Sequence, residues 1–262
     1  MKVVVKIVVL LSFFFNINVF AEENIKQKAP MTAGEGTPLA EDEVKVGRYG
    51  EDDEIPEDFK FNEAEVKLWL SDHLENIKKP QSLYYEFVKS GSLEEGFSDS
   101  VYLKILELNE DGTKNTALDF FTADRKQPVN ADNVTNIIGN PVLGVFMHGD
   151  TSDMARLTGG KKSRSRYFIK AIKVALREIA VVEPITFSFN DKEYKGEKIY
   201  FAPYLNDPHR RDFERYAEKY YEFIFSDNIP GSLYQIKTVI PDMAGENKEP
   251  LIQETLTFMD MK

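Results

Sequence analysis

Cysteine is absent from this chain of 262 residues, and histidine and tryptophan are scarce, with three residues and one residue respectively. The lack of cysteine excludes disulfide bonds, thiol catalysis, thiolate metal ligands and a lipid-modified cysteine. The histidines are His73, His148 and His209, and no two of them have the i, i+4 spacing of a metal-binding helix. We therefore expect neither a metal ion nor any other cofactor.

Basic residues are also few relative to acidic ones. The chain has 33 Lys and Arg residues against 44 Asp and Glu residues, which gives a formal net charge of −11. Such an excess of negative charge disfavours contact with a phosphate backbone, so we expect no nucleic-acid partner.

Long hydrophobic runs are missing apart from Ile7–Phe20, which follows Lys2 and Lys6. About 14 apolar positions are too few for a membrane-spanning helix. Basic residues, a short apolar run and the tripeptide Val19-Phe20-Ala21 match the parts of a secretory signal peptide. We predict that residues 1–21 are a cleavable signal peptide and that the mature protein is periplasmic, without an integral membrane segment.

The segment that follows, residues 22–60, is polar and contains twelve acidic residues and few large apolar ones. It cannot bury enough apolar surface to offset the entropy of ordering. We predict a disordered acidic linker over 22–60, followed by a single domain over 61–262.

Helical and strand patterns alternate along the first half of this domain. Asn62, with Glu65 three residues on, forms a capping-box pattern, and an apolar stripe through His73 predicts a helix that ends at Ile77. We interpret His73 as a core histidine rather than a ligand. Alternating or aromatic segments then predict three strands over Leu83–Lys89, Ser100–Leu108 and Thr113–Thr122, followed by a long connection over Thr122–Gly139.

The second half contains further strands and helices. We predict a short buried strand over Pro141–Met147, a turn, and a short helix from Asp150 or Thr151 to Leu157, closed by Gly159-Gly160. Hairpin strands are expected over Ile185–Asn190 and Lys198–Tyr204, and a helix from Asp207-Pro208 with Phe213, Tyr216, Ala217 and Tyr220 inside. Three strands complete the chain: Tyr221–Phe225, Gly231–Ile240 and Leu251–Met259. Strands in runs predict an antiparallel sheet and an α+β class with three or four helices.

The segment Ser163–Ala180 predicts a two-faced helix. Phe168, Ile172 and Leu176 lie in its apolar stripe, whereas the opposite side is entirely basic. Like charges one turn apart repel each other, so either acidic groups of this protein or an anionic partner must offset them. The candidate residues for binding an anionic group are Lys161, Lys162, Arg164, Arg166, Lys170, Lys173 and Arg177.

Signals for catalysis are weak. Gly160-Lys161-Lys162-Ser163 lacks the earlier glycine and the strand of a phosphate-binding loop, and no Gly-x-Ser-x-Gly elbow occurs. No catalytic residue is therefore named, and we expect a non-catalytic protein rather than an enzyme. The 19 Phe and 12 Tyr residues concentrate in strands, where they either meet covering helices or line a ligand cavity.

The C-terminal strands Tyr220–Asp227, Gly231–Ile240 and Leu251–Met259, with the turn Ile229-Pro230-Gly231 and the earlier strand Leu83–Lys89, resemble periplasmic lipid and lipoprotein carriers of the LolA-like type. That resemblance implies an incomplete antiparallel barrel that holds helices in its concavity and shields acyl chains. The helical block Asp150–Ala180 departs from the simplest plan of that family.

Three functions follow from these patterns. The first is a periplasmic, non-catalytic binding or carrier protein for an amphipathic or anionic lipid-like ligand. The alternative is an envelope interaction module that docks through its basic helix, with an acidic envelope protein or membrane headgroups as the partner. The third is an envelope hydrolase.

Overall fold

The computed structural model describes residues 60–126, 134–160, 162–243 and 249–262, with only the backbone described for residues 162 and 163. The predicted signal peptide and all but the last residue of the predicted linker lie outside these ranges. The two corresponding predictions therefore stay predictions.

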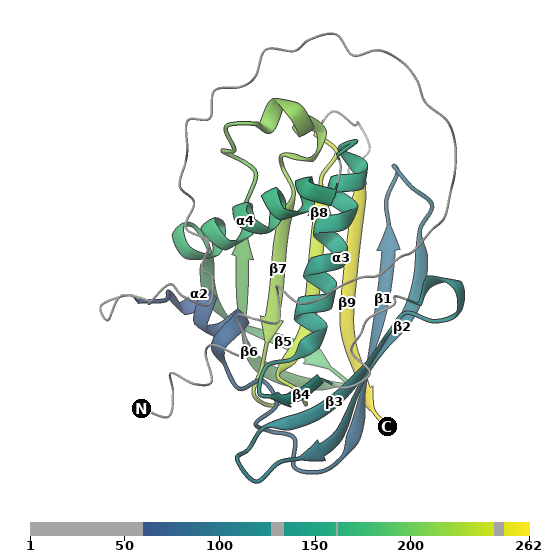
Figure 1. Ribbon diagram of the computed structural model, residues 1–262, viewed down its shortest axis with the longest axis vertical. Helices are drawn as coiled ribbons and strands as arrows, with labels where there is room; N and C mark the ends of the chain where they lie inside the picture. The colour runs from purple at the N-terminus through teal and green to yellow at the C-terminus, as the bar shows by residue number, and fades with distance from the viewer. Residues whose placement is uncertain (1–59, 127–133, 161, 244–248) are drawn as a thin grey trace. The chain divides into compact units, whose positions relative to one another are not determined.

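The described residues contain one open sheet of nine antiparallel strands in the order β4-β3-β2-β1-β9-β8-β7-β6-β5 (Figure 1). The first four strands form one side of the sheet, the last five form the other, and β1 pairs with β9 where the two meet. Strands β4 and β5 are the free edges. The strands are β1 Gln81–Ser90, β2 Phe97–Leu108, β3 Lys114–Phe120, β4 Val134–Ile137, β5 Val181–Phe189, β6 Lys192–Phe201, β7 Tyr220–Phe225, β8 Leu233–Ile240 and β9 Ile252–Met261.

The sheet curls strongly at its β5 end. The ring of Phe187 in β5 stacks on that of Tyr234 in β8 with centroids 4.1 Å apart, and Phe189 meets Phe258 of β9 at 5.6 Å. In a flat sheet, β5 and β8 would be separated by about 14 Å, because neighbouring strands are about 4.8 Å apart. The α+β class and the curved, open antiparallel sheet predicted from the sequence are thus confirmed.

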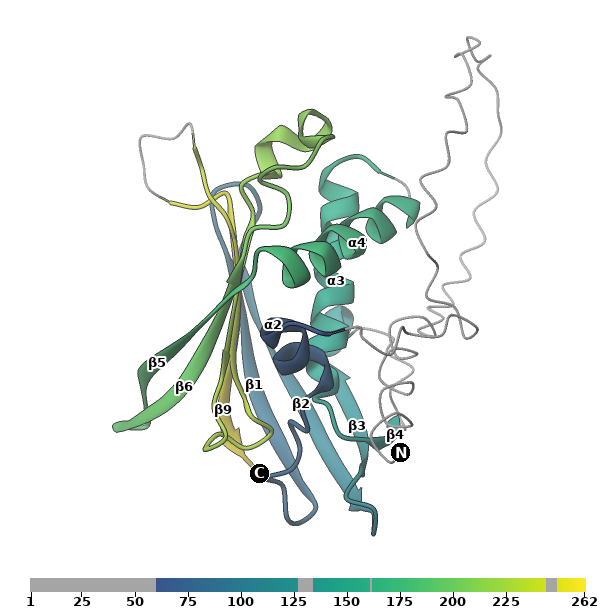
Figure 2. The same ribbon diagram turned by 90° about the vertical axis from the view of Figure 1, so that its left-hand side faces the viewer.

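A layer of helices covers one face of the sheet (Figure 2). It consists of α2 (Glu63–Glu65), the π-helical turn η1 (Val66–Leu70), α3 (Pro141–Leu157) and α4 (Lys162–Glu178). Two 3₁₀ segments, η2 (Ala123–Arg125) and η3 (Arg210–Tyr216), lie in connections.

One core joins the helices to the sheet. Leu143 of α3 and Phe168 of α4 are buried in the same apolar cluster as Leu83, Phe223 and Leu256 of the strands. Helices therefore cover the sheet face that carries these strand residues, and the buried aromatic strand residues on that face pack against them (Figure 2).

The first helix is shorter than predicted. Asn62 does form the capping box with Glu65, but the helix ends at Leu70 instead of Ile77. The amide of Ser71 donates a hydrogen bond to the carbonyl of Val66. The Nε2 atom of the His73 ring donates to the carbonyl of Lys67 at 2.7 Å. The other ring nitrogen of His73 accepts from the amide of Asn140 at 3.1 Å. His73 is thus a core histidine as predicted, and its two bonds compete with continuation of the helix.

The predicted strand over Pro141–Met147 and the turn after it were wrong, whereas the predicted helix up to Leu157 is present. Residues 141–157 form one helix, α3, rather than a strand followed by a short helix. Pro141 occupies the first turn, where its missing N–H costs nothing, and the side chain of Asn140 accepts from the amide of Val142 at 3.1 Å. Val142 to Met147 are all buried, so this part of the helix shows no polar face. A continuous apolar run of this length does not distinguish a buried helix from a buried strand.

The predicted helix after Asp207 was also wrong. Instead of capping a helix, the carboxylate of Asp207 accepts from the amide of His209 at 2.8 Å and from the hydroxyl of Tyr167. Only the 3₁₀ segment η3 follows, with Phe213 in a non-helical conformation, and Tyr220 already belongs to β7. The short strand β4 lies inside the predicted connection 122–139 and pairs at only a few positions on the sheet edge.

Gly231 offers a test of how the sheet fits the start of α3. Its φ of +74° is a left-handed conformation, and a Cβ there would lie 2.6 Å from Cδ1 of Leu83. We expect Gly231→Ala to reduce the free energy of unfolding by more than the ~1 kcal/mol of left-handed strain alone. Urea unfolding of the variant measures the loss.

Gly159→Ala is the matched control, because Gly159 has a φ of +64° and no atom lies within 4 Å of the place that a Cβ would take there. It should lose only the ~1 kcal/mol of backbone strain. Equal losses in the two variants would show that the contact with Leu83 adds no cost beyond the backbone strain.

Candidate functional site

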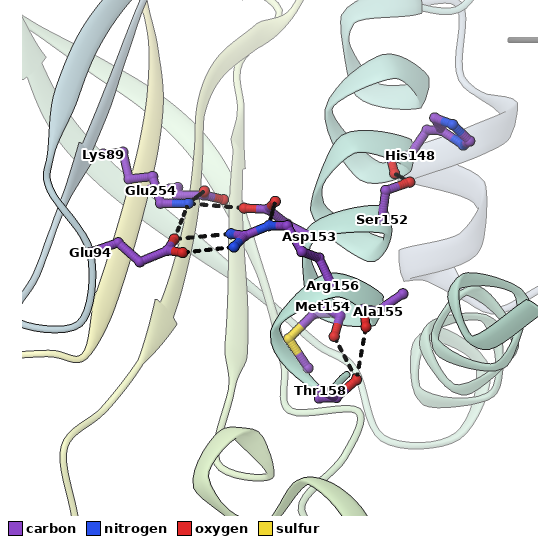
Figure 3. A network of polar contacts seen from close by, with 10 residues as sticks. All are labelled: Lys89, Glu94, His148, Ser152, Asp153, Met154, Ala155, Arg156, Thr158 and Glu254. Carbon is purple, nitrogen blue, oxygen red and sulfur yellow. Dashed lines mark hydrogen bonds and ion pairs between the residues drawn. The ribbon is translucent and has the colours of Figure 1, made fainter. Parts of the chain in front are cut away.

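A group of charged side chains lies between the C-terminal half of α3 and the sheet (Figure 3). Helix α3 contributes Asp150, Asp153 and Arg156, at three-residue spacing. We call this group the polar seam. It comprises these three residues with Lys89 of β1, Glu94 of the β1–β2 loop, Lys219 and Tyr221 at the start of β7, and Glu254 of β9.

Lys89 is the centre of the outer part of the polar seam. Its Nζ atom lies 2.9 Å from Asp153, 3.1 Å from Glu254 and 3.1 Å from Glu94. Arg156 contacts both oxygens of Glu94, at 2.8 and 3.1 Å, and its Nε donates to Asp153 at 3.0 Å. The outer part thus ties α3 to β1 and to the loop after it.

Asp150 is the centre of the inner part. It forms an ion pair with Lys219 and accepts a hydrogen bond of 2.6 Å from the hydroxyl of Tyr221. The hydroxyl of Tyr204 lies 3.2 Å from that of Tyr221. All four side chains are buried, with exposed fractions of 4% or less. Since a buried charge without its partner is costly, this pair fixes the position of α3 on the sheet.

Burial and neighbouring charges shift several pKa values in opposite directions. Burial, together with the charges of Asp150 and Asp153, raises the pKa of Glu254 above its ordinary value, despite Lys219 and Lys89. Burial would raise the pKa of Asp153, but hydrogen bonds from Arg156 and Lys89 outweigh it and lower the value. A hydrogen bond from Arg156 is the main cause that lowers the pKa of Glu94.

The charges of the polar seam balance only when one acid is protonated. Three cations, Lys89, Arg156 and Lys219, face the four carboxyl groups of Glu94, Asp150, Asp153 and Glu254. The raised pKa of Glu254 favours the protonated form of this carboxyl group. A pair of this kind can exchange only when another ion takes the place of the lost partner, because a buried charge left alone is costly.

An aromatic cluster adjoins the polar seam beneath the N-terminal half of α3. Phe87, two residues before Lys89 in β1, lies 4.7 Å from Phe121, 5.4 Å from Phe97 and 6.4 Å from Phe146 of α3, measured between ring centroids. Phe97 and Phe121 are half-buried, and Phe121 has a left-handed φ of 67°. An apolar surface next to exchangeable charges suits a molecule with an apolar chain and a charged head.

The basic residues predicted from the sequence do not converge on the polar seam. Lys161 lies outside the described residues, and the side chain of Lys162 is not described. Arg164 donates to the carbonyl of Thr158 at 2.8 Å and lies 3.9 Å from Asp212. Arg177 contacts Glu65 at 3.1 Å through both Nε and Nη2. Acids of the protein itself thus meet both ends of the predicted face.

The middle of that face is different. Arg166 and Lys170 are exposed, and within the described ranges neither makes an ion pair. Lys173 is half-buried, and its pKa is lowered by burial and by the charge of Arg177.

Sequence reasoning missed the polar seam, although its strand residues leave a signal. Lys89 continues the inward series Leu83, Tyr85 and Phe87, and Glu254 interrupts the series Ile252, Leu256 and Phe258. A charge at an inward position of a strand indicates a buried polar partner.

Two further findings concern other kinds of site. Along the described part of the chain, no helix combines the length and the apolar character needed to cross a membrane. The same residues contain no group of three or more histidine, aspartate or glutamate side chains placed to hold a metal ion.

The likenesses of this chain to known proteins are weak. No protein-family model and no curated protein matches the chain. Among solved structures, it is similar to the lipoprotein LppX of Mycobacterium tuberculosis, with 9% identity and a TM-score of 0.29 over 72% of this chain and 91% of LppX. It is also similar to a LolA superfamily protein from Nitrosomonas europaea, with 12% identity and a TM-score of 0.19 over 76% and 92% of the two chains.

The weak resemblance to LolA-like proteins that the sequence predicted is thus found among solved structures as well. At these identities and TM-scores the likenesses support no functional conclusion. The case for a function rests on the polar seam and the aromatic cluster.

Compared with the parent, the variant Glu254→Gln should become more stable as the pH rises. The folded protein holds the Glu254 proton above the ordinary pKa of 4.5, so the stability of the parent falls as pH rises from 4.5 through the raised value. Glutamine removes this dependence. Urea unfolding of variant and parent at matched pH values measures the difference, which should grow with pH. Glu94→Gln is the control of opposite sign, because the pKa of Glu94 is lowered and its stabilisation is lost on acidification.

Lys219→Met should reduce the free energy of unfolding by about 3 to 5 kcal/mol, because it leaves Asp150 buried without its cation. The double variant Asp150→Asn with Lys219→Met should lose less than the single variant, since it removes both charges. A double-variant loss equal to or above the single loss would contradict this role for the pair.

Proposed function

We propose that this protein is a periplasmic, non-catalytic binding or carrier protein for an amphipathic, anionic lipid-like ligand. The observation that carries the proposal is the arrangement under α3, where an aromatic cluster and ion pairs lie side by side on the helix-covered face of the sheet.

The apolar part of such a ligand has a suitable surface in the aromatic cluster. Phe87 and Phe146 are buried there, whereas Phe97 and Phe121 remain half-buried at its margin. Burial of an acyl chain contributes about 0.8 kcal/mol for each methylene group. A chain that enters between α3 and β1 would thus replace the contacts that these rings now make with α3.

The charged head of the ligand has suitable partners in the polar seam. Lys89, Arg156 and Lys219 already hold carboxylates there. An anionic group could take the place of a carboxylate that becomes protonated, and the raised pKa of Glu254 makes it the acid suited to this exchange. Two of these cations lie on the sheet and one lies on α3, so the exchange would also loosen α3 from the sheet.

A second candidate is an envelope interaction module that docks through α4. The exposed side chains of Arg166 and Lys170 favour it, and it does not exclude ligand binding under α3.

The single tryptophan provides a direct test. Trp69 lies in η1, half-buried against the core that joins helices and sheet. A fatty acid brominated along its chain should quench Trp69 fluorescence in a saturable manner, because bromine quenches only at short range. An unbrominated fatty acid should reverse the effect by competition.

Phe97→Ala should weaken this binding several-fold by removing half-buried ring surface from the aromatic cluster. Phe189→Ala is the matched control, because it removes a half-buried ring at the far end of the sheet. Native mass spectrometry of detergent-free protein completes the test. A clean mass without lipid, together with no quenching, would overturn the proposal.

A further inference from the structure

The exposed side of α4 carries positive charges, and only some of them form ion pairs with acidic residues of the protein. We call Arg166, Lys170, Lys173 and Arg177 the basic face; their spacing places them on one side of the helix. No acidic residue occurs in α4 before Glu178. Repulsion between cations one turn apart costs a few tenths of a kcal/mol for each pair, and Arg166 and Lys170 make no ion pair with another described residue.

The ends of the helix are held firmly. Arg164 contacts Thr158 and Asp212 near its start. At its other end, Asn62 donates to the carbonyls of Leu176 and Arg177 at 2.6 and 2.7 Å, and Glu65 pairs with Arg177. These contacts give the basic face a fixed orientation.

Apolar side chains are exposed beside these charges. Val174 lies four residues after Lys170 and three before Arg177, and it is 44% exposed. Ile179 and Val181, which follow the end of the helix, are 51% and 53% exposed. A convex helix surface with cations around an exposed aliphatic side chain fits a lipid surface, where charges meet headgroups and apolar groups enter the interface.

We propose that the basic face of α4, with Val174, docks this protein on the surface of an anionic lipid membrane. The net charge of −11 does not oppose this contact as a whole, because salt screens charges more than about 8 Å from the membrane. Each basic residue at an anionic surface contributes about 1 kcal/mol. The proposal goes beyond the ligand site under α3 and does not depend on it.

Co-sedimentation with vesicles tests this proposal. The full chain should bind vesicles that contain phosphatidylglycerol, should bind far less to pure phosphatidylcholine, and should release at high salt. Arg166→Gln with Lys170→Gln should weaken binding about 30-fold, which corresponds to two contributions of about 1 kcal/mol. Val174→Ser should weaken it several-fold without any change in charge.

The double variant Lys78→Gln with Lys79→Gln is the matched control, because it removes two exposed charges from the turn before β1. It should bind like the parent, as should the charge-conserving variant Arg166→Lys with Lys170→Arg. Equal losses in both glutamine pairs, or no binding of the parent to phosphatidylglycerol vesicles, would overturn the proposal. If the parent does not bind phosphatidylglycerol vesicles, an acidic protein becomes the candidate partner of the basic face.

Discussion

The buried ion pair between Asp150 and Lys219 is the contact on which the position of α3 depends. Both side chains are almost fully buried, and the hydroxyl groups of Tyr221 and Tyr204 extend the network. The cost of removing both charges from water offsets most of their attraction, so the pair adds little to the free energy of unfolding. Its main effect is on where α3 docks on the sheet. Any other placement of α3 would leave Asp150 or Lys219 buried alone. The polar seam therefore selects one docking geometry, while the apolar half of the helix supplies the burial.

This division within α3 gives its two halves different kinds of contact with the sheet. The half from Val142 to Met147 is held by apolar packing, which an acyl chain can replace with contacts of the same kind. The half from Asp150 to Arg156 is held by ion pairs, and separating either pair leaves a buried charge without its partner. A purely apolar molecule would replace only the first kind of contact, which is why the ligand proposed above is amphipathic.

The fold was predictable where one face of an element meets water. Strands β1 to β3, β7 and β9 largely alternate with period two, and α4 has opposite apolar and basic sides, so their patterns identified them. The errors occur where burial or tertiary hydrogen bonds override the pattern. Pro141–Met147 is buried on every side and shows no period. His73 bonds Lys67 and Asn140, which no local rule reveals, and those bonds end the first helix early.

The basic face and the polar seam also differ in how far the sequence reveals them. The basic face is local, because its residues lie on one helix and their spacing reveals it. The polar seam joins residues that are far apart in the sequence, such as Lys89 with Glu254 and Asp150 with Lys219, so only the sheet order brings them together. Their energetics differ as well. The polar seam reaches charge balance within the protein once Glu254 is protonated. In the basic face, by contrast, Arg166 and Lys170 are exposed and make no ion pair with another described residue.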